Sequence, residues 1–197
     1  MANFTDIVYS FEGKIYLNIT NKCPCRCSFC IRGNKDALGS AKNLWFDSDP
    51  TIEQIKDAID NFKGFDGYDK EVVFCGYGEP LFALDNLIET ARYIKDKFSL
   101  KIRVNTNGLG DLINKKPTVP LLKGLVDSVS ISLNAPDSKS YQEIVNPAFG
   151  EQSFDAMLKF AKECKDSIPD VHFSVVEQFG VPSRMPSTKP PIVCMGV

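Results

Sequence analysis

Residues 21–30 read Asn21-Lys22-Cys23-Pro24-Cys25-Arg26-Cys27-Ser28-Phe29-Cys30 and directly follow a strand-like segment, residues 14–20. Three thiolates spaced as Cys23, Cys27 and Cys30 on one loop can hold three corners of a cubane iron–sulfur cluster and leave the fourth iron open to a ligand that is not protein. Structural zinc instead takes four closed ligands, usually two cysteine pairs or a cysteine pair with a histidine pair. No second pair follows, and the one histidine, His172, lies far down the chain. The spacing therefore predicts a [4Fe-4S] cluster, with zinc or ordinary reduced thiols as the alternatives.

The composition indicates a chain that can fold around a core of its own. With 197 residues, of which 43% are hydrophobic, it is most simply one domain. A formal net charge of -2 indicates no dominant electrostatic partner, and nothing in the charge points to nucleic acid. Seven cysteines without a signal peptide or a transmembrane run are typical of reduced thiols in the cytoplasm, with no membrane partner. An exposed cluster there favours low oxygen.

Strand-like and helix-like patterns alternate along the chain. Helices are predicted at residues 51–62, where Thr51 and Gln54 form a capping-box pair, at 85–98, and after Ser153. Strands are predicted at residues 14–20, 71–76, 100–106, 127–134 and 171–177. The alternation is typical of an α/β protein with a mainly parallel sheet.

The chain divides into a core and a tail. Residues 1–180 are expected to form one core domain, and residues 181–197 a proline-rich tail, because residues 181–191 contain four prolines. The final run, residues 191–197, can supply a short last strand, although no helix pattern precedes it.

The predicted strands have one apolar and one polar face. In the first predicted strand, Tyr16, Asn18 and Thr20 lie on the face opposite the apolar side chains. The third and fourth predicted strands show the same alternation, with asparagines and serines on the polar face. A parallel strand buried between two helix layers would be apolar on both faces. The repeated polar face therefore predicts a partly open barrel with a polar, solvated or ligand-filled lumen, with an exposed sheet face as the alternative.

Suggestive loops follow the carboxyl ends of four predicted strands, where barrels and open α/β sheets build their sites. The cysteine loop follows the first strand. Gly76-Tyr77-Gly78-Glu79-Pro80, Asn105-Thr106-Asn107-Gly108 and Ser132-Leu133-Asn134-Ala135-Pro136 follow the next three. Each segment alone is typical of an ordinary turn, but their common position predicts one functional rim.

These motifs together resemble the radical S-adenosylmethionine (SAM) superfamily. Cys23-x-x-x-Cys27-x-x-Cys30, with the aromatic Phe29 before the last cysteine, matches its cluster motif, and residues 76–80 are similar to its Gly-Gly-Glu-Pro segment. The resemblance covers nearly all of residues 14–177 and implies a partial (β/α)5-6 TIM-like open barrel, truncated or irregular at the C-terminus. Within the superfamily, the sequence segments at residues 17–21, 74–80 and 129–137 most resemble those of the small radical SAM proteins associated with TatD-type nucleases.

The resemblance implies two cofactors, a [4Fe-4S] cluster on Cys23, Cys27 and Cys30 and SAM on its open iron. In such enzymes an electron, here expected from a donor such as flavodoxin or ferredoxin, cleaves SAM to methionine and a 5′-deoxyadenosyl radical, which abstracts hydrogen from substrate. Gly78 and Glu79 are expected to meet the amino group of SAM, and Phe29 to pack near its adenine. The full set expected to bind the cofactor is Phe29, Gly76, Tyr77, Gly78, Glu79, Asn105, Asn107, Ser132 and Asn134. For the polar members, hydrogen bonds to the rim backbone are the alternative role.

No catalytic residue for the substrate step can be assigned, and the weak candidates are Cys194, His172 and Arg103. A core, structural or tail role is the alternative for each. Cys25 interrupts the motif spacing and is expected not to be a ligand, and the long segment 31–50 is expected to cover the site.

The molecule acted upon is not identified by the sequence and can be a small molecule or a protein. One alternative is a glycyl-radical-type activating enzyme acting on a protein partner. The other is a non-catalytic iron–sulfur or zinc redox protein. Because the expected last helix and closing strand are missing, a partner or a second copy of the chain can complete the barrel edge.

Overall fold

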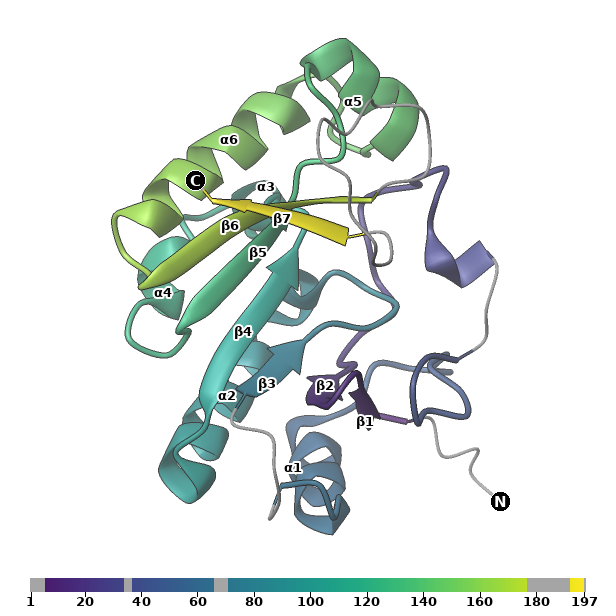
Figure 1. Ribbon diagram of the computed structural model, residues 1–197, viewed down its shortest axis with the longest axis vertical. Coiled ribbons are helices and arrows are strands. Elements are labelled where there is room, and N and C mark those ends of the chain that lie inside the picture. The colour runs from purple at the N-terminus through teal and green to yellow at the C-terminus, as the bar shows by residue number, and fades with distance from the viewer. Residues whose placement is uncertain (1–5, 34–36, 66–70, 177–191, 197) are drawn as a thin grey trace.

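The sheet of this computed structural model runs in chain order from one edge to the other (Figure 1). The structure describes residues 6–33, 37–65, 71–176 and, as backbone, 192–196. Within these ranges seven strands form a single sheet, β1-β2-β3-β4-β5-β6-β7. The strands are β1 (Val8–Phe11), β2 (Lys14–Leu17), β3 (Glu71–Phe74), β4 (Lys101–Thr106), β5 (Ser128–Ser132), β6 (Asp170–Val176) and β7 (Ile192–Gly196).

The five strands from β2 to β6 pair in parallel, and the two edge strands pair antiparallel. Parallel pairing places Leu17 opposite Phe74 and Phe74 opposite Val104, so the carboxyl ends of β2, β3 and β4 meet at one edge of the sheet. The edge strands β1 and β7 run antiparallel to β2 and β6. Strands in sequential order that pair in parallel are typical of a partial, open (β/α) barrel.

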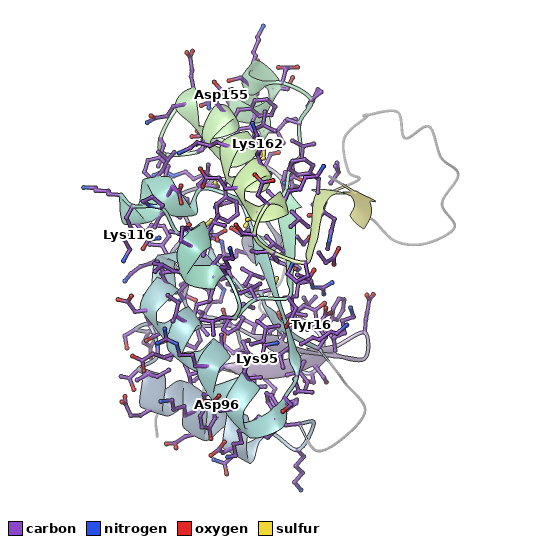
Figure 2. All side chains as sticks on the ribbon, turned by 90° about the vertical axis from the view of Figure 1, so that its left-hand side faces the viewer. Tyr16, Lys95, Asp96, Lys116, Asp155 and Lys162 are labelled. Carbon is purple, nitrogen blue, oxygen red and sulfur yellow. The ribbon has the colours of Figure 1, made fainter. Side chains whose placement is uncertain are left out.

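Helices cover one side of this sheet, as Figure 2 shows edge-on, with Tyr16 on the other side. The connections contain η1 (Ile31–Gly33), α1 (Ile52–Asn61), η2 (Pro80–Ala83), α2 (Leu84–Phe98), α3 (Gly110–Asn114), α4 (Val119–Leu122), α5 (Ser138–Val145) and α6 (Gln152–Lys165). Apolar residues of the strands and helices, such as Ile15, Ile59, Ile94 and Val129, are fully buried between the two layers and form the main core. No helix of the described chain is long and apolar enough to cross a membrane.

The five predicted strands and three predicted helices are present, with differences at their ends. The capping box at Thr51 and Gln54 is formed, because each side chain bonds the backbone of the other. The last long helix begins at Gln152, so Ser153 lies inside it rather than before it. Strand β2 ends at Leu17, because Asn18 turns toward loop partners. A short last strand forms as β7, antiparallel to β6, and residues 181–191 of the predicted tail lie outside the described residues.

The prediction of a polar lumen filled by solvent or ligand is wrong for the first half of the sheet, which the chain itself fills. Tyr16 lies there in a second apolar cluster, the inner cluster, and Asn18 and Thr20 are buried. Segment 38–45 covers this face, so the buried polar groups bond protein rather than water: Asn18 donates to the Leu44 carbonyl and Thr20 to Asp49. The inner cluster consists of Tyr9, Tyr16, Leu44, Val73 and Tyr77. The polar face is therefore partly filled by the chain itself.

Candidate functional site

The cysteine loop, residues 21–30, is held by backbone hydrogen bonds to the end of α5. The Arg26 amide donates to the carbonyls of Val145 and Asn146, at 3.1 and 3.2 Å, and the Ser28 amide donates to that of Ile144 at 3.0 Å. The Ala148 amide in turn donates to the Pro24 carbonyl at 2.8 Å. These bonds pin a loop without regular structure onto a folded element, so the positions of the cysteines depend on the rest of the domain.

Cys25 lies inside the loop in hydrogen-bonding contact with the thiols of Cys23 and Cys27. This contact with Cys25 lowers the pKa of Cys23 to about 6 and also lowers the pKa of Cys27. The pKa of Cys25 itself is raised by the same two contacts and by its burial. Because a thiolate is the form that binds metal, the lowered pKa values favour Cys23 and Cys27 as ligands.

Cys30 lies at the end of the loop beside Arg32 of η1. The Arg32 Nε donates to Cys30 Sγ at 3.3 Å, and its Nη1 donates to the Asn21 carbonyl at 3.1 Å. The guanidinium also lies 6.0 Å from the centroid of the Trp45 ring. Cys23, Cys27 and Cys30 are all partly exposed, whereas Cys25 is buried.

These residues fit an iron–sulfur cluster by the chemistry of their donors. Three partly exposed thiols, two of them with a lowered pKa, share one loop beside the cation of Arg32, which is a suitable environment for thiolates. Within the described residues no three His, Cys, Asp or Glu side chains lie close enough together to hold a single metal ion. A cluster instead takes each thiolate on a different iron, so its ligands need not converge on one point.

Gly76 and Gly78 allow the loop after β3 to pass close to residues 18–20, which follow β2, and to the cysteine loop. A Cβ at Gly76 would lie 2.1 Å from Asn18 Oδ1, and a Cβ at Gly78 would lie 2.3 Å from the Thr20 carbonyl oxygen. The Glu79 amide donates to the Lys22 carbonyl at 2.8 Å, next to Cys23. Neither glycine has a positive φ. The close approach of the neighbouring segments therefore explains why glycine is needed at both positions.

The Glu79 side chain ties the loop after β3 to the end of β4. Oε1 accepts from the Thr106 hydroxyl at 2.6 Å and from the Leu81 amide at 3.2 Å, and Oε2 accepts from the Asn107 amide at 2.8 Å. Burial raises the pKa of Glu79 to about 7, against the lowering effect of these hydrogen bonds. Asn107 extends the network, because its Nδ2 donates to Cys25 Sγ at 3.6 Å. Glu79 thus connects three rim segments beside the cysteines.

Two asparagines of the expected cofactor set, Asn134 and Asn105, differ in the hydrogen bonds that their side-chain oxygens make. Asn134, at φ +54°, uses Oδ1 to accept the Val176 amide at 3.0 Å and thereby joins the ends of β5 and β6. The Oδ1 of Asn105 is buried with no hydrogen-bond partner among the described residues.

The remaining residues of the expected cofactor set are aromatic or small. The ring of Tyr77 packs in the inner cluster and meets Trp45 edge-to-face at 4.9 Å between centroids. Phe29 lies partly exposed on the cysteine loop, and Ser132 ends β5 partly buried.

Two of the weak substrate candidates, Arg103 and His172, lie on the inner side of β4 and β6. Backbone register places Asn105, Ser130 and His172 side by side across three strands, and Ser174 opposite Cys194 in β7. Arg103 Nη2 lies 3.7 Å from a carboxylate oxygen of Glu71 on β3. These positions bring Asn105 and His172 together in one row, whereas the side chain of Cys194 lies outside the described residues.

Sequence reasoning did not assign a role to four residues that shape the site. Thr106 anchors Glu79, Asn18 bonds the loop after β3, and Arg32 contacts Cys30. Cys25, expected not to be a ligand, lies in contact with two expected ligands. The alternation of polar and apolar residues already placed Asn18 on the polar face of its strand. The contacts of Arg32 and Cys25 depend on loop geometry, which cannot be predicted from a periodic pattern.

An open, mainly parallel barrel with a three-cysteine loop at the carboxyl ends of its strands defines a class of cluster-dependent α/β enzymes. Comparison with protein families narrows this class. The Radical SAM superfamily model matches residues 17–183, and the chain belongs to this family. Enzymes of the family use a [4Fe-4S] cluster and SAM, and membership of the family does not specify a substrate.

Two curated relatives give finer comparisons. The dual-specificity RNA methyltransferase RlmN of Buchnera aphidicola subsp. Schizaphis graminum is 32% identical over 150 residues, which cover 71% of this chain and 39% of the relative. The probable dual-specificity RNA methyltransferase RlmN of Pseudothermotoga lettingae is 32% identical over 160 residues, covering 80% of this chain and 44% of the relative. The chain thus spans about two fifths of the length of these relatives.

A solved structure shows the same fold. The crystal structure of a radical SAM methyltransferase from Sphaerobacter thermophilus superimposes with a TM-score of 0.58 at 18% sequence identity. The match covers 88% of this chain and 50% of the other chain. The relatives carry RNA methyltransferase names, so they support the superfamily assignment and not the finer likeness to TatD-associated proteins.

Proposed function

We propose that this chain cleaves SAM reductively and uses the resulting 5′-deoxyadenosyl radical to abstract hydrogen from a substrate that is still to be identified. The observation that carries the proposal is the geometry at Cys23, Cys27 and Cys30, where one loop presents three thiols beside the Gly76–Glu79 segment. When bound, the cluster and SAM supply a one-electron cleavage of a carbon–sulfur bond. A low-potential protein such as flavodoxin or ferredoxin is the proposed electron donor.

The chain itself positions the reactants. The α5 end fixes the cysteine loop, and the amide of Glu79 fixes the loop after β3 against it. The inner cluster and segment 38–45 exclude water from the first half of the sheet face, which protects a radical from solvent. Gly78 and Glu79 remain the proposed contacts for the SAM amino group, although the Glu79 carboxylate already accepts three protein donors.

Methyl transfer to RNA is the second candidate function. The relatives named above are RNA methyltransferases, and one of them matches 80% of this chain. The net charge of -2 gives no sign of a nucleic-acid partner, so an RNA substrate would be recognised by local contacts or by residues outside this chain. The likeness to TatD-associated proteins and the glycyl-radical-type activation of a protein partner are weaker candidates, since no contact in the described chain favours either.

The test is anaerobic reconstitution with iron and sulfide, followed by reduction, addition of SAM and chromatography for 5′-deoxyadenosine. The proposal expects close to four irons per chain and 5′-deoxyadenosine that is lost in Cys27→Ala. Cys164→Ala is the matched control, because this buried thiol of α6 packs in the main core away from the loop. Product that persists unchanged in Cys27→Ala, or a preparation that binds zinc and no iron, contradicts the proposal.

A parallel assay separates the two candidate functions. The same enzyme is incubated with unmodified, transcribed RNA and SAM labelled in its methyl group. Label in the RNA that is lost in Cys27→Ala supports methyl transfer. 5′-deoxyadenosine without label in the RNA favours hydrogen abstraction from another substrate.

A further inference from the structure

Arg32 contacts both ends of the cysteine loop. Its Nε donates to Cys30 Sγ at 3.3 Å, and its Nη1 donates to the carbonyl of Asn21, the first residue of the loop, at 3.1 Å. The planar guanidinium makes the two bonds from different nitrogens, which a lysine ammonium cannot reproduce with the same geometry. The side chain therefore holds the last cysteine at a set distance from the start of the loop.

Trp45 contributes to the position of this cation. The Arg32 guanidinium carbon lies 6.0 Å from the centroid of the Trp45 ring, and that ring meets Tyr77 edge-to-face. Tyr77 is anchored in turn, because its amide donates to Asn18 Oδ1 at 3.2 Å. The positive charge is thus placed by contacts from the loop, from segment 38–45 and from the loop after β3.

The two cations within the cysteine loop itself, Lys22 and Arg26, are placed differently from Arg32. Lys22 pairs with Asp49 at 2.9 Å, and its side chain is 66% exposed. Arg26 is exposed, and its contacts to the α5 end are made by its backbone. Among the described residues, Arg32 is the cation for which a hydrogen bond to a cysteine sulfur is found.

We infer that Arg32 is a positioning residue that raises the reduction potential of the cluster through Cys30. The inference rests on the proposed cluster ligation by Cys23, Cys27 and Cys30. Reduction by an external low-potential donor adds one electron, and therefore one negative charge, to the cluster. A fixed cation and an N–H donor at a ligand sulfur stabilise the reduced state more than the oxidised state. Arg32 thereby eases the electron transfer that precedes cleavage of SAM.

The test is a redox titration of the reconstituted full chain, without SAM, followed by EPR of the reduced cluster. At a fixed solution potential, Arg32→Gln is expected to lower the ratio of reduced to oxidised cluster about tenfold, a downward shift of about 59 mV for one electron. Gln keeps an N–H donor and removes the charge. Arg32→Lys keeps the charge and is expected to lie between Arg32→Gln and the unchanged protein.

Arg26→Ala is the matched control, because it removes the same charge from an exposed position of the same loop and is expected to leave the potential unchanged. An unchanged potential in Arg32→Gln, at unchanged iron content, overturns the inference, as does an equal shift in Arg26→Ala. If Arg32→Gln binds less iron, the reduction potential of its cluster-loaded fraction is compared with that of cluster-loaded Arg32→Lys. The inference requires the lower potential in Arg32→Gln, and equal potentials overturn it. A protein with native Arg32 that binds no cluster refutes the proposed ligation itself, which distinguishes that failure from failure of the inference.

Discussion

Replacing Gly78 by alanine is expected to displace the cysteine loop. A Cβ at this position would lie 2.3 Å from the carbonyl oxygen of Thr20 and 2.8 Å from that of Lys22. Both atoms belong to backbone that leads directly into Cys23, so no flexible side chain can move aside. Restoring ordinary contact requires a shift of about 1 Å in one of the two segments.

The cost of this shift follows from the contacts that it strains. Overpacking of this kind costs about 1–3 kcal/mol, and the hydrogen bond from the Glu79 amide to the Lys22 carbonyl contributes about 1 kcal/mol more when it is broken. A loss of about 3 kcal/mol lowers the Tm of a chain of this size by roughly 6–12 °C. Calorimetry of the iron-free protein measures the stability, and iron content after anaerobic reconstitution measures the site.

Gly33→Ala is the matched control for this substitution. No atom lies within 4 Å of a Cβ built at Gly33, which follows the cysteine loop, and its φ is not in the left-handed region. Its Tm and iron content are expected to stay close to those of the unchanged protein. If Gly78→Ala keeps the Tm and iron content of Gly33→Ala, close approach is not the reason for a glycine at this position.

Three further predictions concern single side chains. For Glu79, burial raises the folded-state pKa from 4.5 to about 7, so its contribution to stability is fully present below pH 4.5 and is lost as the pH rises through 7. Glu79→Gln should therefore flatten a fall of roughly 3 kcal/mol in the unfolding free energy of the iron-free protein between about pH 4 and pH 8. Urea titrations in which the unfolding free energy falls equally with pH in both proteins contradict this. Asn18→Ala removes the hydrogen bonds that Asn18 makes with the buried carbonyl of Leu44 and with the amide of Tyr77, and should cost about 3 kcal/mol by the same method. A cost below about 1 kcal/mol means that water replaces the side chain. Thr51→Ala removes the cap of α1 and should cost about 1 kcal/mol in a thermal melt without changing the iron content, and an unaltered melt shows that the cap contributes nothing.

The order of strands and helices could be predicted from the sequence because each long element has a clear period. Helix α1 has both a capping box and buried Ile55 and Ile59 on one face, and the fully buried Ile15 and Leu17 alternate along β2. The short elements α3 and α4 have too few residues to show a period. Helix α5, which was not predicted from the sequence, begins after Asp137, whose side chain accepts a hydrogen bond from the Ser140 amide. This N-cap is a sequence signal from which the helix could have been predicted.

The sequence suggests which residues form the candidate site, but it does not show which residues they contact. The spacing of Cys23, Cys27 and Cys30 predicts ligand chemistry, because that prediction depends only on positions in one loop. The polar face of β2 was interpreted as lining a solvated or ligand-filled lumen, because alternation shows that a face is polar and does not show what covers it. Segment 38–45, which covers it, has no periodic pattern, and its position is set by contacts with residues far away in the chain, such as Tyr77.

The attachment of the cysteine loop to the end of α5 has a consequence for synthesis of the protein. The loop is made before β3, β4 and β5, whereas its backbone partners, Ile144 to Ala148, are made after them. On a growing chain the thiols therefore lack the anchors that set their final arrangement. We therefore expect stable cluster insertion only after α5 has been made, and we expect the nascent cysteines to be more open to oxidation until then.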